Sequence, residues 1–354
     1  MTAIPPFVVR GRVLGEGPAF VVAEAGVNHN GDLELARRLV DAAAEAGADA
    51  VKFQTFRTDA LVSGAAPKAR YQVETTGGDE SQRAMLTRLE LGPEAHAVLR
   101  DHAAARGIVF FSTPFDEASA DLLDRLGVEL LKVPSGEATN VPLLRHLAAK
   151  GRPIILSTGM CTLDEVATAV ATLREAGDPP LAILHCVSAY PAPAEDTNLR
   201  AMDTLRARFG CPVGLSDHSL GLEIPLAAVA RGAAVLEKHL TLDRALAGPD
   251  HRASLEPADF AALVRGVRAV EAALGDGDKR PMPSELDTRA VARRSLVAAR
   301  ALPPGHRLGR EDVAVKRPGT GIPPGELERV LGRRLARAVG ADELLDWSML
   351  GPAP

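Results

Sequence analysis

The sequence contains few aromatic residues and few cysteines, and both shortages restrict what the protein can be. Phe, Tyr and Trp together make up 3% of the 354 residues, with a single Trp. A surface on which nucleic-acid bases stack is therefore not expected. The three cysteines, Cys161, Cys186 and Cys211, are an odd number at wide spacing. We expect no disulfide framework, and a reducing, cytoplasmic location fits this cysteine usage best.

Long apolar runs and clusters of one charge are missing as well. No apolar stretch approaches the roughly 20 residues that a membrane-spanning helix needs, and the N-terminus does not resemble a secretory signal. The formal net charge is -5, with 41 basic and 46 acidic residues interspersed along the chain. Binding to nucleic acid usually relies on a clustered basic face, so neither nucleic acid nor membrane is an expected partner.

Eight short apolar runs alternate with amphipathic stretches over the first 275 residues. The runs cover residues 19–26, 49–56, 107–115, 129–136, 153–159, 181–188, 212–219 and 234–242. Between them, as at 33–48 and 163–177, apolar residues recur at the three- and four-residue spacing of a helix. Strands buried on both faces and separated by helices form parallel sheets, and eight such units predict an α/β fold, a closed (β/α)8 TIM barrel. An open doubly wound sheet is the alternative, but no G-x-G-x-x-G follows the first strand.

The character of the chain changes after residue 275. Residues 276–294 are polar and contain proline, which predicts a linker between a barrel domain at 1–275 and a small domain at 295–354. Short strand-like pieces at 295–300, 313–319 and 334–340 are separated by Pro-Gly turns. This pattern indicates a small, mostly β module.

Polar residues gather where the predicted strands end, which is where (β/α)8 barrels carry their chemistry. They are Glu24, Asn28, His29, Lys52, Gln54, Ser112, Thr113, Lys132, Ser135, Glu137, Ser157, His185, Ser188, Tyr190, Ser216, Asp217, His218, Glu237, Lys238 and His239. The apolar Phe115 stands beside Thr113 at the end of the third strand. Burying an unpaired Lys or Glu is costly, so these side chains should pair with one another, bind a ligand, or do both.

Two groups of residues in this set suggest binding of a particular ligand. Lys52 and Lys132, with serine hydroxyls nearby, suit a phosphate and a carboxylate. His218 and His239, on neighbouring strands, suit a divalent transition metal that also binds substrate oxygens. Taken singly, each lysine is as readily explained by a structural ion pair, and each histidine more readily by a hydrogen-bonded core position.

Two further features have structural explanations. Cys186 follows His185 directly, and neighbouring residues of one strand point to opposite faces, so the two cannot act as a pair. We interpret Cys186 as a small core filler. The segment from Asn28 to Gly31 is equally well explained as a turn that caps the next helix.

Taken together, the motifs resemble those of the sialic acid synthases, the N-acetylneuraminate synthases with their legionaminate and pseudaminate relatives. The matching segments are AEAGVNHNGD, AVKFQTF, FFSTPFD, LKVPSGE, ILSTGM, LHCVSAYPAP, VGLSDHS, LEKHLTLDRALAGPDH and VKRPGTGI, in the family's order over nearly the whole chain. The resemblance implies a barrel followed by an antifreeze-like (SAF) domain. It also implies a domain-swapped homodimer in which the tail of one subunit covers the barrel of the other.

The resemblance assigns roles to individual residues. It implies Mn²⁺, or Mg²⁺ or Co²⁺ in its place, held by His218 and His239. Phosphoenolpyruvate would contact Gln54, Lys132, Ser135, Ser157 and Ser216, and the sugar would contact Lys52, Glu137, Tyr190 and Asp250, with Arg317 reaching it from the partner subunit. Thr113, Phe115 and Ser188 also belong to the expected substrate site, and Glu24, Lys52 and Glu137 are the expected catalytic residues. Ser188 stands where some members have Asn near the phosphoenolpyruvate carboxylate, and Thr76 stands where some have Asn on the loop at the sugar side.

The expected reaction is a metal-dependent condensation of phosphoenolpyruvate with an N-acetylated amino sugar. The acceptor would be N-acetylmannosamine, a related diacetamido hexose or a 6-phosphate, among which the sequence does not choose, and the products would be a nine-carbon 2-keto acid and phosphate. One alternative is a barrel aldolase that forms a Schiff base through Lys52 or Lys132. The other is a carbohydrate-binding protein with an inactive barrel.

Overall fold

The computed structural model describes residues 7–352, which belong to two compact units, Met1–Gly275 and Asp276–Pro354. Each unit has its own buried apolar core. In the described part of the chain, no helix combines the length and the hydropathy that crossing a membrane requires.

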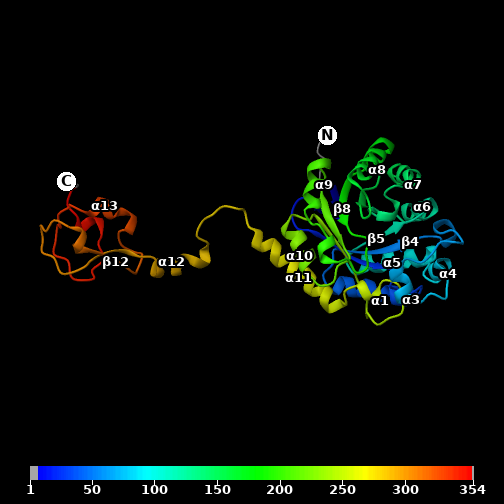
Figure 1. Ribbon diagram of the computed structural model, residues 1–354, viewed down its shortest axis with the longest axis horizontal. Coiled ribbons are helices and arrows are strands. Elements are labelled where there is room, and N and C mark those ends of the chain that lie inside the picture. The colour runs from blue at the N-terminus through cyan, green and yellow to red at the C-terminus, as the bar shows by residue number, and fades with distance from the viewer. Residues whose placement is uncertain (1–6, 353–354) are drawn as a thin grey trace. The chain divides into compact units, whose positions relative to one another are not determined.

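Eight parallel strands form the centre of the larger unit (Figure 1). They are β3 (Phe20–Gly26), β4 (Ala50–Thr55), β5 (Val109–Pro114), β6 (Leu131–Val133), β7 (Ile154–Ser157), β8 (Leu181–Cys186), β9 (Val213–Asp217) and β10 (Val235–His239). Their hydrogen-bonded order is β5-β4-β3-β10-β9-β8-β7-β6, and the two end strands β5 and β6 also lie side by side. The sheet therefore curls into a nearly closed barrel, and the predicted (β/α)8 architecture is confirmed.

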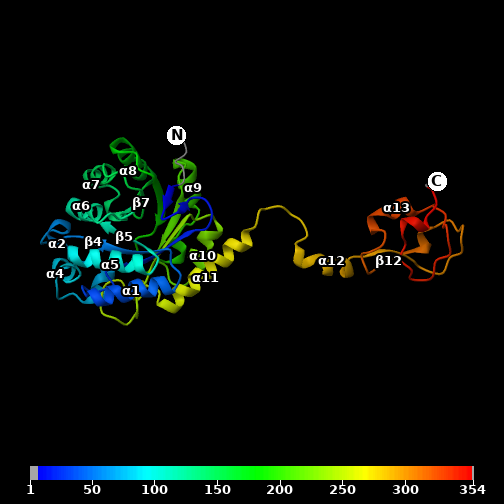
Figure 2. The same ribbon diagram turned by 180° about the vertical axis from the view of Figure 1, so that it is seen from behind.

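Helices surround the barrel and bury their apolar faces against the outside of the strands (Figure 2). They are α1 (Leu33–Glu45), α5 (Pro93–Ala105), α6 (Glu117–Arg125), α7 (Val141–Ala148), α8 (Leu163–Ala176), α9 (Ala201–Phe209), α10 (Glu223–Ala230) and α11 (Pro257–Leu274). Local sequence explains where several begin. Asp32 accepts hydrogen bonds from the amides of Glu34 and Leu35 at the start of α1, and Thr162 forms a capping box with Glu165 at the start of α8.

A short N-terminal hairpin, which we did not anticipate from the sequence, packs at the amino ends of the barrel strands. Strands β1 (Phe7–Val9) and β2 (Arg12–Leu14) pair in antiparallel fashion. The turn between them runs through Arg10 and Gly11, both with positive φ. Phe7, Val9 and Leu14 of the hairpin belong to the same buried cluster as Phe20 and Phe111 inside the barrel. This apolar floor leaves polar chemistry to the carboxyl ends of the strands.

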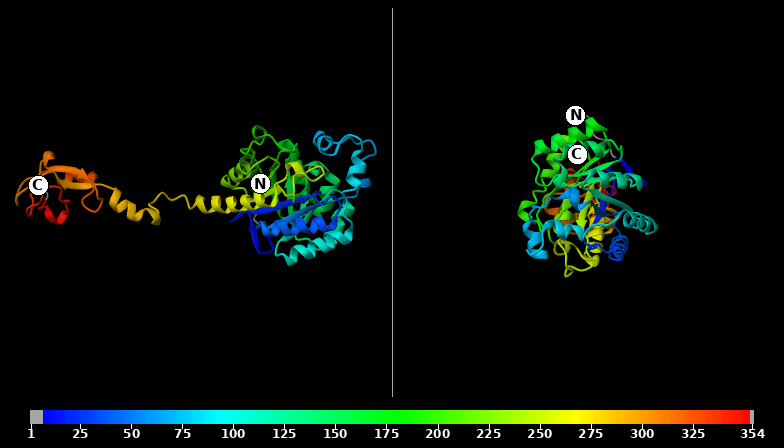
Figure 3. Two further views of the ribbon diagram at one scale, coloured as in Figure 1. Left: turned by 90° about the horizontal axis from the view of Figure 1, so that it is seen from below. Right: turned by 90° about the vertical axis from the view of Figure 1, so that its right-hand side faces the viewer.

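The connection from β4 to α5 is longer than the others and forms three short helices. We call residues 57–91 the β4–α5 segment. It contains α2 (Thr58–Leu61), α3 (Arg70–Thr76) and α4 (Gln82–Thr87), visible in lighter blue at the edge of the barrel in Figure 3.

The smaller unit is built on one antiparallel pair, β11 (Ser295–Ala298) with β12 (Val313–Lys316), and carries the short helix α13 (Leu327–Val330). The expected strand at 334–340 is wrong, because its residues make only isolated bridges to three different segments. Within the predicted linker, residues 286–292 form a helix, α12 (Leu286–Ala292), none of whose side chains is buried.

Candidate active site

A cavity of about 410 Å³ lies at the carboxyl ends of the barrel strands. The predicted residues that line it are Glu24, Lys52, Gln54, Thr113, Phe115, Lys132, Ser135, Ser157, Ser188, Tyr190, Ser216, His218, His239 and Asp250. Of the residues expected to form the site, only Glu137 and Arg317 are not part of this lining. The structure therefore brings together side chains from all eight strand ends and their following loops.

Four charged side chains form a buried network across the barrel interior. The ammonium nitrogen of Lys52 lies 2.7 Å from Oε2 of Glu24 and 3.7 Å from Oε1 of Glu237. Lys132 approaches the same Glu237 oxygen at 3.4 Å. All four side chains are at most 5% exposed. Such a network is expensive to desolvate, and it leaves two cationic groups at the wall of the cavity, where they can meet an anionic substrate.

Neutral polar side chains complete the network. The Lys52 ammonium also donates to Thr113 Oγ1 at 2.9 Å. The amide of Gln54 donates to Glu24 Oε1 at 3.2 Å, and the hydroxyl of Ser216 donates to Glu237 Oε1 at 3.1 Å. Gln54 and Ser216, both predicted substrate contacts, therefore also orient a carboxylate of the network, whereas Thr113 orients the Lys52 ammonium.

The two carboxylates differ in their protonation. Burial raises the pKa of Glu24 to about 7, although the nearby Lys52 acts in the opposite direction. Burial also acts to raise the pKa of Glu237, but Lys132 and Lys52 outweigh it and lower that pKa to about 2. Glu237 is therefore ionised at neutral pH, whereas Glu24 can hold or release a proton there, as a group that moves protons must.

This difference predicts a pH dependence of stability for the metal-free protein. The pKa of Glu24 rises from 4.5 to about 7 on folding, so its contribution to stability is fully present below pH 4.5 and is lost as pH rises through about 7. Glu24→Gln removes this dependence. We expect the free energy of unfolding of the wild type to fall relative to Glu24→Gln between about pH 5 and pH 8, measured by denaturant titration. A constant difference across this range would contradict the assignment.

The two histidines present their rings to the cavity side by side, with centroids 5.4 Å apart. Nδ1 of His218 lies 2.8 Å from the carbonyl oxygen of Val187, so it donates there and leaves Nε2 as the free lone pair. Nδ1 of His239 is buried without a hydrogen-bond partner, and burial lowers the pKa of His239 well below its ordinary value. Burial acts to lower the pKa of His218 as well, but its contacts with Cys186 and Val187 together outweigh burial and raise that pKa. A neutral His239 and the Nε2 of His218, which has no partner in the part of the chain that the structure describes, fit a divalent transition metal, because a bound metal takes the place of the proton.

A metal at this place would not be enclosed by protein ligands. Within residues 7–352, no group of three or more His, Cys, Asp or Glu side chains is arranged to hold an ion. Two imidazoles would leave the remaining coordination positions to water or substrate oxygens, as in catalytic rather than structural metal sites.

Cys186 is not a core filler, contrary to our interpretation of the sequence. Its sulfur lies 3.8 Å from Nδ1 of His218, and the residue lines the cavity. The preceding His185 points the other way and donates from Nε2 to the carbonyl of Thr197 at 2.6 Å. The alternation of neighbouring side chains was therefore predicted correctly, but not which of the two faces the cavity.

Asp217 and Lys238 illustrate the structural explanation of a strand-end charge. They form a buried ion pair with each other, and the Asp217 carboxylate also accepts hydrogen bonds from the amide and hydroxyl of Ser219. Neither residue lines the cavity. Their ion pair links β9 to β10, and neither side chain belongs to the candidate active site.

A group of hydroxyls lies beside Lys132 on the wall formed by β6, β7 and β8. Ser135 accepts a hydrogen bond from the amide of Gly159 at 2.9 Å. Ser157 Oγ is buried without a partner among the described residues. A Cβ at Gly159 would collide with the hydroxyl of Ser188 and lie 2.9 Å from that of Ser135. The glycine keeps this space open, and one cation with several hydroxyls suits a phosphate or carboxylate group.

Another part of the cavity lining is aromatic and acidic. The ring of Tyr190 lies 4.1 Å from that of His218 and 4.9 Å from that of Tyr71, centroid to centroid. Asp250 is buried at the cavity, and burial raises its pKa to about 6. Phe115 packs edge-on against Phe56. Aromatic faces next to a polar group that can donate or accept are suited to a sugar ring.

Glu137 and Arg317 lie elsewhere in the structure. Glu137 ends the short 3-10 turn Ser135–Glu137, and its carboxylate accepts a hydrogen bond from Asn140 Nδ2 at 2.6 Å. Arg317 is exposed and belongs to the smaller unit, where it follows β12.

Of the β4–α5 segment, the resemblance places Thr76 on the sugar side of the site, but the residues of this segment that line the cavity are others. They are Leu61, Val62, Ala69, Tyr71, Gln72, Gln82, Met85, Leu86 and Leu89. They stand on three short helices with no long apolar period, so the pattern that located the strands had nothing to detect here. The available signal was the length of the connection between β4 and α5.

A (β/α)8 barrel whose strand ends carry buried lysines, neighbouring imidazoles and a proton-holding glutamate has the organisation of an enzyme rather than of a binding module. Comparison with known proteins identifies which enzyme family it is. The NeuB family model matches residues 39–279, and the SAF domain model matches residues 293–351. The chain belongs to the NeuB family, the sialic acid synthases, which form carbon–carbon bonds.

Relatives resemble the chain over nearly its whole length. N,N'-diacetyllegionaminic acid synthase of Legionella pneumophila is 49% identical over 332 residues, which cover 93% of each chain. Human N-acetylneuraminate-9-phosphate synthase is 36% identical over 94% of this chain and 92% of its own. The crystal structure of N-acetylneuraminic acid synthetase from Leptospira borgpetersenii in complex with citrate has 37% identity and a TM-score of 0.71, covering 81% of this chain and 96% of that one.

Proposed function

We propose that this protein condenses phosphoenolpyruvate with an N-acetylated amino sugar, N-acetylmannosamine or a diacetamido hexose, to a nine-carbon 2-keto acid with release of phosphate. The observation that supports this most strongly is that one cavity holds two different sets of groups. Lys132 with its neighbouring serine hydroxyls suits a small dianion, whereas the Tyr190 and Asp250 wall suits a sugar. The names of the relatives support the same reaction type.

The residues of the cavity have distinct roles in this proposal. Lys132, Ser135 and Ser157 hold the phosphate, and holding both substrates at contact distance supplies much of the acceleration. A divalent metal, Mn²⁺ foremost, would be held by His218 and His239 and supplies Lewis acidity to the sugar carbonyl oxygen when bound.

Proton handling falls to Glu24. It is the carboxylate at the cavity whose pKa lies near 7, so it can accept a proton from the water that adds to carbon 2 of phosphoenolpyruvate. Glu137 was expected to share this role. Its position outside the cavity lining supports a role for it in holding the turn before α7 instead.

The decisive experiment is a phosphate-release assay with phosphoenolpyruvate across a panel of N-acetylated hexoses, with and without a chelator. Release that needs both an acceptor sugar and a divalent metal would support the proposal and exclude an inactive barrel. No release with any acceptor, in the presence of metal, would refute it.

One observation favours the Schiff-base alternative. Burial lowers the pKa of Lys132, and a lysine that forms a Schiff base must lose its proton first. Borohydride trapping with pyruvate separates the two mechanisms, because an aldolase would be covalently labelled at the lysine and a metal-dependent synthase would not.

We also propose that the protein works as a domain-swapped homodimer in which Arg317 completes the sugar site of the partner barrel. The exposure of Arg317 supports this, because a guanidinium on a loop can donate to a carbonyl oxygen of the sugar. Arg317→Ala should lower kcat/KM for the sugar roughly tenfold, the loss of one charge-assisted hydrogen bond. Phosphoenolpyruvate kinetics should not change.

Mixed dimers test whether Arg317 acts in the partner. In a heterodimer of Arg317→Ala with His218→Ala, the barrel with intact histidines receives the intact arginine, so its kcat/KM should return to the wild-type value per working site. Without recovery, in heterodimers confirmed by mass spectrometry, Arg317 would have to act within its own subunit or outside the site.

A further inference from the structure

The turn after β3 contains a buried asparagine whose side chain the next helix does not use. From the sequence alone, residues 28–31 were equally well explained as a turn that caps α1. The cap is formed instead by Asp32, whose carboxylate accepts hydrogen bonds from the amides of Glu34 and Leu35. Asn28 is only 1% exposed and does not line the cavity. Its amide group therefore has to find its partners in other parts of the barrel.

The amide of Asn28 donates two hydrogen bonds to the chain that follows β10. Its Nδ2 lies 2.9 Å from the carbonyl oxygen of Leu240 and 2.9 Å from Oγ of Ser254. The single hydroxyl proton of Ser254 is donated to the carbonyl oxygen of Asp250, at 2.7 Å, so Ser254 can only accept from Asn28. Both partners are thus acceptors, and they fix which way the amide faces.

The first of these bonds acts next to His239. Leu240 is the following residue, and its backbone is held on both sides, because its N–H donates to the carbonyl of Glu24 at 2.8 Å and its C=O accepts from Asn28. Nδ1 of His239 has no hydrogen-bond partner among the residues that the structure describes, whereas a backbone carbonyl orients the ring of His218. The place of the His239 imidazole therefore depends on how the backbone beside it is held.

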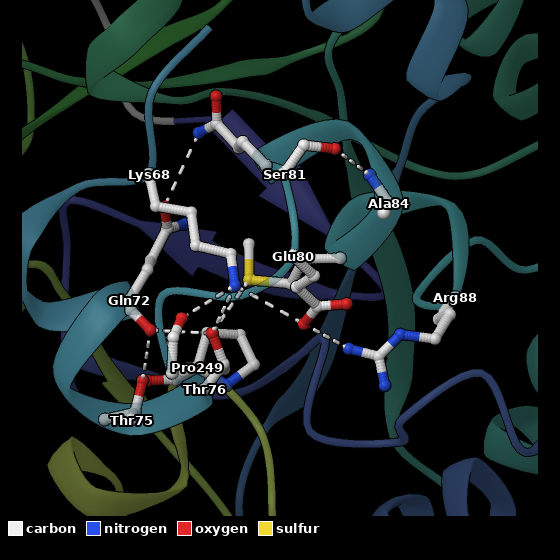
Figure 4. A network of polar contacts seen from close by, with 12 residues as sticks. Lys68, Gln72, Thr75, Thr76, Glu80, Ser81, Ala84, Arg88 and Pro249 are labelled. Atoms are coloured by element: carbon white, nitrogen blue, oxygen red, sulfur yellow. Dashed lines mark hydrogen bonds and ion pairs between the residues drawn. The ribbon is translucent and has the colours of Figure 1, made fainter.

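The second bond acts on Asp250, which is buried at the cavity. Ser254 holds the carbonyl of Asp250 itself. The carbonyl before it, that of Pro249, receives a longer contact of 3.4 Å from the hydroxyl of Thr75 (Figure 4). That hydroxyl lies closer, at 2.9 Å, to the carbonyl of Tyr71 within its own helix. The link through Ser254 is therefore the stronger of the two in setting the position of Asp250.

The amide of Asn28 also has an unmet requirement. Its Oδ1 is buried without a hydrogen-bond partner in the chain from residue 7 to residue 352. A buried carbonyl oxygen without a partner destabilises the folded protein. An apolar side chain of similar size would avoid that cost but would hold neither Leu240 nor Ser254. The two bonds to the chain after β10 thus offset a local loss of stability, a situation that is common near functional sites.

We infer that Asn28 is a positioning residue, which fixes His239 and Asp250 relative to each other without touching the substrates. Those two residues lie at the start and near the end of one loop, and a single amide links both ends to the turn after β3. The phosphate-binding wall on β6, β7 and β8 takes no part in these contacts. The inference rests on the proposed function, because that proposal assigns metal binding to His239 and sugar binding to Asp250.

Asn28→Ala removes both bonds. The dissociation constant of Mn²⁺, measured by electron paramagnetic resonance on the metal-free protein without substrates, should rise roughly tenfold, as when a group that orients a metal ligand is lost. At saturating Mn²⁺, the KM for N-acetylmannosamine or the diacetamido hexose, whichever reacts faster, should also rise roughly tenfold, because a sugar contact is misplaced. The KM for phosphoenolpyruvate should stay unchanged. A residue that only supported the fold would not separate the two KM values.

Ser254→Ala separates the two effects. This variant loses the link to Asp250 but keeps the bond from Asn28 to Leu240. The KM for the sugar should rise roughly tenfold, while the Mn²⁺ dissociation constant should stay near that of the wild type. Asp32→Ala is the matched control in the same turn, because it removes the helix cap and lowers stability. It should leave the Mn²⁺ dissociation constant and both KM values unchanged.

The possible results distinguish the inference from the proposed function. Unchanged Mn²⁺ affinity and unchanged sugar KM in a folded Asn28→Ala protein would overturn the inference, as would a parallel rise of both KM values. Should this variant fail to fold, Ser254→Ala decides, and an unchanged sugar KM overturns the inference. No phosphate release with any acceptor refutes the proposed function instead. The Mn²⁺ comparison still tests Asn28 in that case: weaker binding by Asn28→Ala than by the wild type and Asp32→Ala supports the inference, and equal binding by all three overturns it.

Discussion

Replacing His239 with Ala is expected to lower kcat by at least roughly a thousandfold, because a metal held by two imidazoles supplies several kcal/mol of transition-state stabilisation. The fold should survive, since His239 makes no hydrogen bond through its buried Nδ1 that the structure would lose. The measurements are steady-state phosphate release and the metal content of the purified protein. Both should fall together in the variant.

The matched control is His185→Ala. This histidine lies on β8, which β9 separates from the β10 strand of His239, and its side chain points away from the cavity, toward the carbonyl of Thr197. Its loss should reduce stability while metal content and kcat stay close to the wild-type values. Full activity in His239→Ala, or equal loss of bound metal in both variants, would show that the metal is not held by this pair.

The replacement of Lys132 by Met is expected to separate activity from stability. The variant loses a charge-assisted contact to phosphate, worth up to about 3 kcal/mol, so kcat/KM for phosphoenolpyruvate should fall roughly 100-fold. Stability should fall less than where a buried pair is broken completely, because the Glu237 carboxylate keeps Lys52 and Ser216 as partners.

Lys238→Met is expected to lower stability and leave activity unchanged, the opposite of Lys132→Met. Lys238 is fully buried and its partner Asp217 lies outside the cavity lining. Removing the lysine leaves a buried carboxylate without its cation, which should cost about 3–5 kcal/mol of stability. The KM for phosphoenolpyruvate should stay unchanged. If Lys132→Met behaved like Lys238→Met, Lys132 would be a structural ion-pair residue and not a substrate contact.

The barrel and most of its cavity follow from the sequence for a physical reason. Strands buried on both faces require continuous apolar runs, and these runs stand out from the amphipathic stretches between them. A charged side chain at the end of such a run, such as Lys52 or Glu237, must form an ion pair or bind a ligand. The parallel arrangement then brings all eight strand ends to one face of the barrel. Glu24, Lys132, His218 and the serines could therefore be placed together without coordinates.

The features that the sequence did not predict depend on tertiary contacts, which leave no trace in the spacing of apolar residues. The direction of Cys186 is set by the register of β8 in the closed barrel. Glu137 follows its strand as the cavity residues do, but the turn after β6 and the amide of Asn140 hold it outside the lining. The part of the cavity lining that includes Met85 lies on three short helices, and side-chain contacts rather than local propensity decide where such helices lie.

The N-terminal hairpin has a consequence for how the chain folds during synthesis. Phe7, Val9 and Leu14 leave the ribosome early, but their buried cluster includes Val235 at the start of β10, and Phe20 pairs with that same residue. The floor of the barrel therefore stays open until β10, which begins at Val235, has emerged as well. Until then these apolar side chains remain exposed to water and to other nascent chains. A chaperone that shields residues 7–14 should accordingly improve the yield of folded protein.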